Sequence, residues 1–227
     1  MKRAYRNRQE AGKILSEELS HYKGQPGLLV LALPRGGVEL AAEIASALNA
    51  ELDILVVRKM GIPGLEEVAM GAIASGGVEV LNKDILPEFD IAQDAVEKVR
   101  QDETKELNRR EMAYRGDRPI YDVRDRSVII VDDGIATGAT IQAAVRSLKG
   151  RQPRRIVIAV PVAPPSSLRD LREMVDEVVC PLVPENFQAV GQWYENFPQT
   201  TDNEVRKILS GAWGTKTVEN QTTAKSN

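Results

Sequence analysis

The chain has 227 residues, a formal net charge of −3 and a hydrophobic content of 42%. This length suits one domain, or one domain with a small subdomain, whose core needs neither a disulfide nor a metal to fold. A single cysteine, Cys180, and a single histidine, His21, exclude an internal disulfide and a zinc site made of Cys and His ligands. The acidic balance argues against a nucleic-acid partner. The apolar runs are far shorter than the roughly 20 residues that span a bilayer, so we expect a cytoplasmic protein with no membrane partner.

The first part of the chain reads as helix, strand, helix, strand. Residues 4–22 have amphipathic helical spacing, and we expect residues 1–24 to pack on the core as an N-terminal helix. Leu28–Leu33 is a short, almost continuous apolar run, which is typical of a strand buried on both faces. Helical spacing returns over Val38–Leu48, and Leu52–Val57 is a second apolar run. This β-α-β order favours a parallel sheet.

The middle of the chain is rich in glycine. Residues 58–77 are predicted to form a loop, since Gly and Pro recur through them, and within it residues 60–77 are a candidate mobile lid, or else an ordinary connection. Val78–Leu81 is a candidate short strand, and residues 91–114 predict a highly charged helix. This helix is interpreted as solvated or bridging rather than as a binding surface.

The second half repeats the alternation of strands and helices. The predicted elements are the strands Val128–Val131, Ile156–Val160 and Val178–Pro181 and the helices Ile141–Leu148, Pro165–Met174 and Asp202–Leu209. We therefore predict an α/β fold, a doubly wound parallel sheet of about five strands, as the core of residues 25–182. Residues 183–214 form a candidate hood segment that holds half of the aromatic side chains, and residues 215–227 a disordered tail.

The segment Val128–Thr140, VIIVDDGIATGAT, carries the clearest chemistry. A buried strand ends at two adjacent carboxylates, Asp132 and Asp133, which can accept hydrogen bonds from a vicinal diol. A loop of small and hydroxyl residues follows, and then a helix N-terminus, where backbone N–H groups bind phosphate. The hydroxyls of Thr137 and Thr140 can donate to the same phosphate. Together these features describe a pocket for a ribose 5-phosphate.

This segment resembles the signature of type I phosphoribosyltransferases, which bind 5-phosphoribosyl-1-pyrophosphate (PRPP) through an apolar strand, an acidic pair and a T-G-x-T loop. The resemblance implies that Asp132 and Asp133 hold the ribose hydroxyls and approach a Mg²⁺ ion. It also implies that the 5-phosphate is bound by the loop residues Ala136, Thr137, Gly138, Ala139 and Thr140. The fold it implies is the type I phosphoribosyltransferase fold with a small hood subdomain and a mobile loop.

Two further segments agree with this resemblance. In the family a short loop after the first core strand contacts pyrophosphate and often contains a non-proline cis peptide. Here Arg35, Gly36 and Gly37 occupy that place, so a cis bond is expected near Pro34–Gly36. Arg58 and Lys59 follow the second strand, in a pattern similar to that of the adenine and orotate enzymes, where such a pair approaches pyrophosphate. A solvated basic pair is the alternative for these two residues.

The acceptor is less clearly encoded. In the hypoxanthine-guanine and xanthine enzymes an Asp usually stands where this chain has Ala136, which disfavours a 6-oxopurine and leaves another purine-like base favoured. Phe187 and Trp193 are candidates for stacking on the base, and core filling is the alternative for both. Glu67, in the candidate lid, is a candidate general acid.

The sequence therefore favours an enzyme that transfers phosphoribosyl from Mg-PRPP to a small nitrogenous base, a step of nucleotide salvage. The alternative is a regulatory protein on the same fold that binds PRPP or a nucleotide. By analogy with the family we also expect a homodimer.

Overall fold

A sheet of five parallel strands forms the centre of the computed structural model, which describes residues 5–82, 88–89 and 91–223 apart from the side chains of Glu67 and 215–223. The strand order is β2-β1-β6-β7-β8. The strands are β1 (Leu28–Ala32), β2 (Glu51–Ile54), β6 (Ser127–Val131), β7 (Arg155–Ala159) and β8 (Glu177–Val179). The prediction of a doubly wound parallel sheet of about five strands is confirmed.

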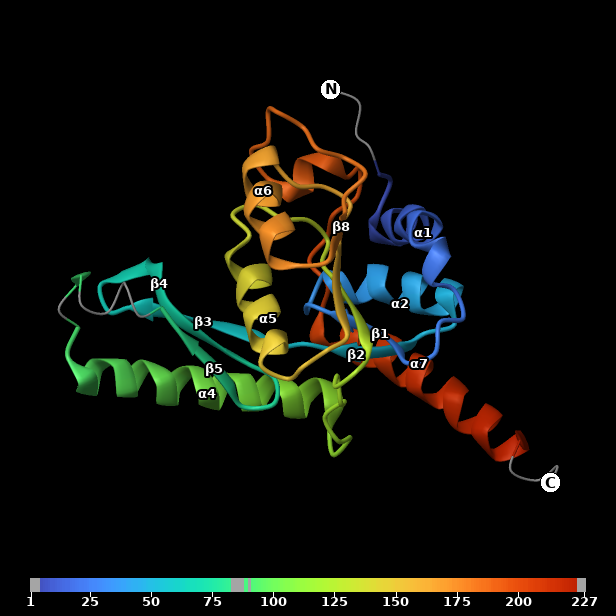
Figure 1. Cartoon of the computed structure of the whole chain (residues 1–227), viewed down its shortest axis with the longest axis horizontal. Coiled ribbons are helices and arrows are strands. Elements are labelled where there is room, and N and C mark those ends of the chain that lie inside the picture. Colours follow the sequence, from blue (N-terminus) through green and yellow to red (C-terminus); the bar gives the residue numbers. More distant parts are fainter. Residues whose placement is uncertain (1–4, 83–87, 90, 224–227) are drawn as a thin grey trace.

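Helices cover both faces of this sheet (Figure 1). The helices are α1 (Arg8–Glu18) and α2 (Gly37–Leu48) on one face, and α5 (Ala139–Lys149) and α6 (Pro165–Met174) on the other. Along β1, Leu28 and Val30 belong to the first core, whereas Leu29 and Leu31 belong to the second. Each side chain of β1 is thus buried under one helical layer or the other, which explains its continuous apolar run.

The segment predicted as a loop over residues 58–77 is instead a second sheet, so this prediction was wrong. The strands β3 (Val57–Ile62), β4 (Leu65–Ala74) and β5 (Val78–Leu81) pair antiparallel in that order. The helix α4 (Gln93–Arg115) lies along this sheet, and the two project together from one side of the central sheet (Figure 1). The single strand expected over Leu52–Val57 is accordingly divided between β2 and β3.

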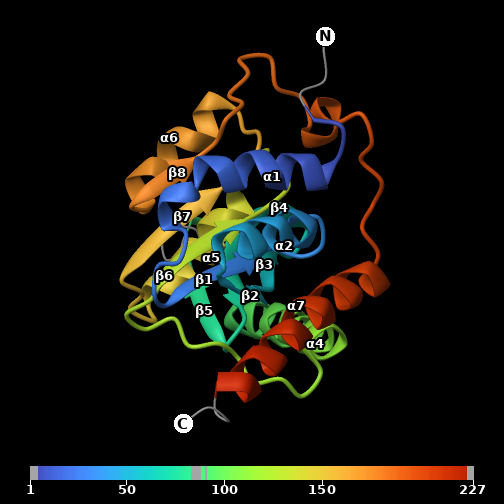
Figure 2. The ribbon, with the colours of Figure 1, turned by 90° about the vertical axis from the view of Figure 1, so that its right-hand side faces the viewer.

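The start of the chain lies against the segment that precedes the last helix. Residues 190–193 form a short 3-10 helix, and Tyr5 forms a parallel bridge with Tyr194. The last helix, α7 (Asp202–Thr223), crosses below α2 and contacts α4 (Figure 2). It extends past Leu209, so the expected tail of residues 215–227 is helical as far as Thr223. None of the described helices is long and apolar enough to cross a membrane.

Candidate functional site

The acidic pair and the glycine loop meet at the carboxyl edge of the central sheet. β1 and β6 run parallel with Ala32 opposite Val131, so the loop after β1 and the pair after β6 emerge side by side. A Cβ added to Gly36 would lie 1.9 Å from Asp133 Oδ2, and one added to Gly37 would lie 2.6 Å from the Val131 carbonyl oxygen. Only glycine permits this approach. The Pro34–Arg35 peptide is cis, as the resemblance implies.

The loop between the acidic pair and α5 is held by hydrogen bonds at Ile135 and Ala136, and part of it is exposed to solvent. The Ile135 N–H donates to the Val162 carbonyl at 2.9 Å, and the Ser167 hydroxyl donates to the Ala136 carbonyl at 2.6 Å. Gly138, with φ of 80°, caps the start of α5. The exposed residues of the loop and of the first turn are Ala136, Thr137, Ala139 and Thr140. A helix N-terminus with exposed hydroxyls and small neighbours suits a phosphate group.

Both carboxylates of the pair are half-buried, and their electrostatics differ. Burial and the neighbouring Asp133 charge raise the pKa of Asp132 well above its usual range. Burial also raises the pKa of Asp133, but the Arg8 guanidinium opposes this rise through a bond of 2.8 Å from Nε to Oδ2. A carboxylate that is poorly hydrated is stabilised when a ligand donates hydrogen bonds to it, as the hydroxyls of a sugar can.

Arg58 and Lys59 point to opposite faces of β3, because successive side chains of a strand alternate. Arg58 Nε donates to Glu103 on α4 at 2.6 Å, so Arg58 is directed toward α4 and away from the candidate phosphate loop, residues 136–140. Lys59 lines a cavity of about 210 Å³ between the second sheet and α5, together with Thr140. Both residues also line a second cavity beside α4, so of the two predicted pyrophosphate ligands only Lys59 lines the cavity of Thr140 as well.

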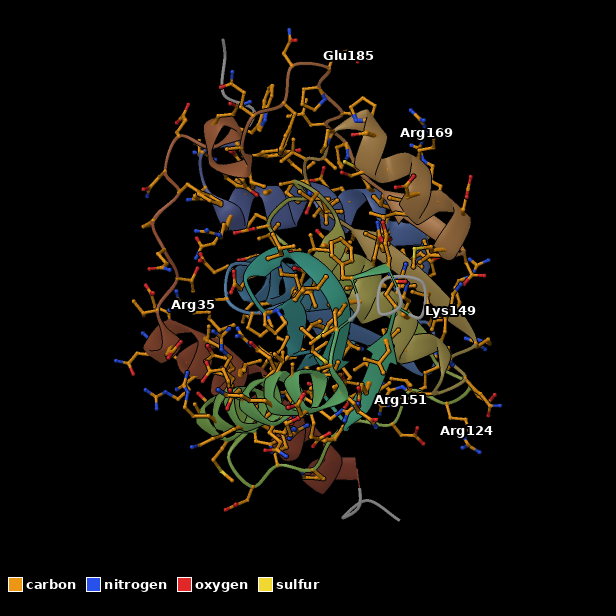
Figure 3. All side chains as sticks on the ribbon, turned by 90° about the vertical axis from the view of Figure 1, so that its left-hand side faces the viewer. Arg35, Arg124, Lys149, Arg151, Arg169 and Glu185 are labelled. Atoms are coloured by element: carbon orange, nitrogen blue, oxygen red, sulfur yellow. The ribbon has the colours of Figure 1, made fainter. Side chains whose placement is uncertain are left out.

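Arg35 is partly exposed at the other end of the site. Its Nη1 atom lies 3.6 Å from Asp202 Oδ1, at the start of α7. Figure 3 shows Arg35 at one edge of the molecule and Glu185, in the segment after β8, at another. Arg35 is thus held near Asp202 by an ion pair that is partly exposed to solvent.

The structure places the candidate general acid and the two candidate base-stacking residues in different environments. Glu67 lies in β4, but its side chain falls outside the described part of the chain. Trp193 is only 5% exposed, so its ring is core filling and offers no face to a base, against the stacking prediction. Phe187 is partly exposed and stays a candidate.

Sequence reasoning missed two residues that touch the acidic pair. Arg8 bonds Asp133, and the Tyr194 hydroxyl donates to the Asp133 carbonyl oxygen at 2.7 Å. Tyr194 was visible only as a member of an aromatic cluster. For Arg8 the sequence signal was weak, because it is one of three arginines, with Arg3 and Arg6, at the start of an amphipathic helix, and arginine is usually solvent-exposed there.

The carboxylates fit a hard cation that brings most of its own ligands. No group of three or more His, Cys, Asp or Glu side chains with metal-binding geometry occurs among the described residues. Asp133 has one oxygen already engaged by Arg8, which leaves few protein ligands at this edge. Mg²⁺ usually keeps several waters and binds through one or two carboxylates and substrate phosphates, so this donor set suits it.

A parallel sheet with an acidic pair and a phosphate loop after its central strand defines the class of phosphoribosyltransferase folds. The chain belongs to this family, because residues 3–196 match the model of the phosphoribosyl transferase domain. Among its relatives is a Mycobacterium tuberculosis protein, provisionally named a phosphoribosyl transferase, which is 42% identical over 206 residues. These residues are 91% of this chain and 46% of the relative, so the chain spans about half the length of the curated relatives it matches.

Solved structures agree on the fold. A crystal structure of a Thermus thermophilus protein is 42% identical and superposes with a TM-score of 0.81, covering 90% of this chain and 97% of that one. An Aquifex aeolicus protein is only 13% identical, with a TM-score of 0.50 over 89% of this chain and 85% of that one. The second likeness shows the fold alone.

Proposed function

We propose that the protein binds Mg-PRPP and transfers the phosphoribosyl group to a nitrogenous base, with release of pyrophosphate. The observation that carries this proposal is the contact between the Gly36 loop and the Asp132–Asp133 pair, directly before the phosphate loop. A ribose 5-phosphate placed there would meet hydrogen-bond acceptors at its hydroxyls and donors at its phosphate. Membership of the family supports the same reaction.

Each part of PRPP has candidate partners. Backbone N–H groups at the start of α5 and the hydroxyls of Thr137 and Thr140 would hold the 5-phosphate. The carboxylates of Asp132 and Asp133 would accept from the ribose hydroxyls. The pyrophosphate would be neutralised by Arg35, the N–H groups of Gly36 and Gly37, and Lys59. Mg²⁺, for which Asp132 and Asp133 offer oxygens, would supply positive charge to the departing pyrophosphate.

The bond from ribose C1 to pyrophosphate is expected to break through an oxocarbenium-like transition state, by analogy with glycoside hydrolysis. Such a cation reacts with water, so the site gains from a cover. The β3–β4 hairpin is the candidate cover, since it borders the same cavity as Thr140. Glu67, in β4, is the candidate general acid for the acceptor.

For the acceptor we propose a purine-like base other than a 6-oxopurine. Ala136 is exposed in the phosphate loop and has no carboxylate to protonate an oxopurine ring. Phe187 is the candidate stacking residue, and base stacking is worth about 1–3 kcal/mol. We further propose nucleotide salvage in the cytoplasm by a homodimer, on family analogy alone.

The experiment is pyrophosphate release from Mg-PRPP across a panel of purine, pyrimidine and pyridine bases, with an Asp132→Asn/Asp133→Asn double variant as control. We expect one base to drive release and the double variant to lose it. If the double variant binds Mg-PRPP as tightly as the unmodified chain, the assignment of the site is wrong.

The second candidate function is a PRPP- or nucleotide-binding regulator. It is favoured by the burial of Trp193, which leaves fewer aromatic faces for an acceptor. Retained Mg-PRPP binding with no release for any base would support this candidate over the enzyme.

A further inference from the structure

Arg8 is a buried charge beside the candidate ribose site. It is the first residue of α1 and is only 5% exposed. Its Nε donates to Asp133 Oδ2 at 2.8 Å, and its Nη1 donates to the Pro198 carbonyl at 2.6 Å. The guanidinium also lies 3.8 Å from the centre of the Phe197 ring. An arginine is desolvated at such a position only when its hydrogen bonds are well satisfied.

Asp133 is enclosed by three separate parts of the chain. Arg8, from α1, donates a hydrogen bond to one carboxylate oxygen, and the Tyr194 hydroxyl donates one to the main-chain carbonyl. On a third side, a Cβ at Gly36 would lie 1.9 Å from Oδ2 and 3.0 Å from Arg8 Nε. The Arg8–Asp133 bond therefore lies directly against the Gly36 backbone. The Arg8 bond is made to Oδ2, so the other carboxylate oxygen, Oδ1, is not the atom that Arg8 engages.

Asp132 is held differently. Its Oδ1 accepts from the Asp133 N–H at 2.8 Å, a contact within the same turn. Of the two carboxylate residues, Asp133 is the one bonded to Arg8 of α1 and to Tyr194. The choice of arginine also matters, because a guanidinium directs two N–H groups to two acceptors, whereas the single ammonium of lysine cannot reproduce that fork.

We propose that Arg8 is a positioning residue for the ribose: by engaging Oδ2 it fixes the Asp133 carboxylate so that Oδ1 can accept from a ribose hydroxyl. This inference rests on the proposed function, because it assigns Asp133 to the sugar. Arg8 does not touch the phosphate loop in this arrangement. Its effect should therefore be confined to the sugar and leave the binding of phosphate unchanged.

The test compares two ligands on the full chain by NMR titration: ribose 5-phosphate, which offers hydroxyls and phosphate, and inorganic phosphate, which offers phosphate alone. The variants are Arg8→Gln, Arg8→Lys and the matched control Arg6→Gln. Arg6 precedes the same helix, but its side chain is exposed and pairs with Glu10 at 2.7 Å. Melting temperatures are measured alongside, because Arg8 is buried.

We expect Arg8→Gln to weaken ribose 5-phosphate binding about tenfold, which corresponds to about 1.4 kcal/mol, and to change phosphate binding less than about twofold. Arg8→Lys should weaken it by a smaller factor, and Arg6→Gln should change neither ligand. If Arg8→Gln does not fold, Arg8→Lys decides: a loss confined to ribose 5-phosphate supports the inference, and unchanged binding overturns it.

Equal losses for both ligands would overturn the inference, since they would show a general structural role. Unchanged binding of both ligands to folded Arg8→Gln would overturn it as well. If the unmodified chain binds phosphate but gains nothing from the sugar, the ribose assignment fails while the phosphate loop stands. If the unmodified chain binds neither ligand, the proposed function itself fails, and the inference fails with it.

Discussion

The substitution Gly36→Ala tests the close approach on which the candidate site depends. Gly36 has φ of −59° and ψ of −37°, so alanine strains no backbone there and any effect is steric. The new methyl group would begin 1.9 Å from Asp133 Oδ2. The carboxylate would have to recede by about 1.5 Å to reach ordinary contact, which breaks its 2.8 Å bond to Arg8.

Two free-energy terms set the size of the effect. Overpacking a tight site costs about 1–3 kcal/mol, and losing a hydrogen bond to a charged group costs about 1.5–3 kcal/mol. Because the terms overlap, we expect the free energy of unfolding to fall by about 2–4 kcal/mol, which for this length lowers the melting temperature by roughly 5–12 °C. Mg-PRPP affinity should fall about 10- to 100-fold, since the ribose loses a positioned acceptor.

Urea denaturation and isothermal titration calorimetry with Mg-PRPP measure the two effects. The matched control is Gly211→Ala, because Gly211 lies within α7 and a Cβ there meets nothing within 4 Å. Alanine at that position should leave PRPP binding unchanged and stabilise the helix by up to about 1 kcal/mol. The reasoning is refuted if Gly36→Ala matches the unmodified chain in both stability and affinity.

Three further predictions concern other parts of the molecule. Lys59→Gln should weaken Mg-PRPP binding about tenfold and Arg58→Gln less than about twofold, because only Lys59 shares a cavity with Thr140; equal losses would contradict the alternation along β3. Arg115→Met should lower the free energy of unfolding at pH 7, measured by urea denaturation, by about 3–5 kcal/mol, because it removes the 2.8 Å partner of the buried Asp53. This loss should shrink as the pH falls toward about 4, because burial raises the pKa of Asp53 and the folded chain therefore binds a proton there at a higher pH than the unfolded chain does. Burial raises the pKa of Cys180 to about 11, so at pH 8 an alkylating reagent should react with the native thiol about 100-fold more slowly than with the urea-unfolded thiol; equal rates would show an open thiol.

The central sheet, and the acidic pair and small-residue loop that follow its middle strand, could be predicted because their signals are local. Each buried strand is a continuous apolar run, as in Leu28–Ala32. The acidic pair and the loop after β6 are consecutive in the sequence, so they can be recognised together. The pairing of the Gly36 loop with Asp133 follows from parallel neighbours ending at one edge.

The second sheet was missed because its glycines were interpreted as breakers. In the structure, Gly61 and Gly71 are packing positions within strands. A Cβ at Gly61 would lie 2.6 Å from the Glu66 carbonyl oxygen, and one at Gly71 would lie 2.7 Å from the Val80 carbonyl oxygen. Glycine in a strand often marks such a close approach or a bulge, and a register shift does occur between Met60 and Gly61. Sequence spacing alone does not separate these cases from a loop.

The enclosure of Asp133 could not be predicted for a different reason. The Tyr5 N–H donates to the Trp193 carbonyl at 3.1 Å, and the Glu195 N–H donates to the Tyr5 carbonyl at 2.9 Å, so the start of the chain is joined to residues 193–195 by contacts of very long sequence separation. No periodicity records such a contact.

These contacts change the meaning of the C-terminal aromatic cluster. Phe187 and Trp193 of this cluster were the candidates for the base, whereas Tyr194 stacks on Phe197 with centroids 4.7 Å apart and donates its hydroxyl to the Asp133 carbonyl. The Arg8 guanidinium lies 3.8 Å from the centre of the Phe197 ring. Tyr194 and Phe197 therefore pack against Asp133 and its Arg8 partner. Under the proposed function, selection of the acceptor would depend on Phe187, and the base panel is the experiment that identifies the acceptor.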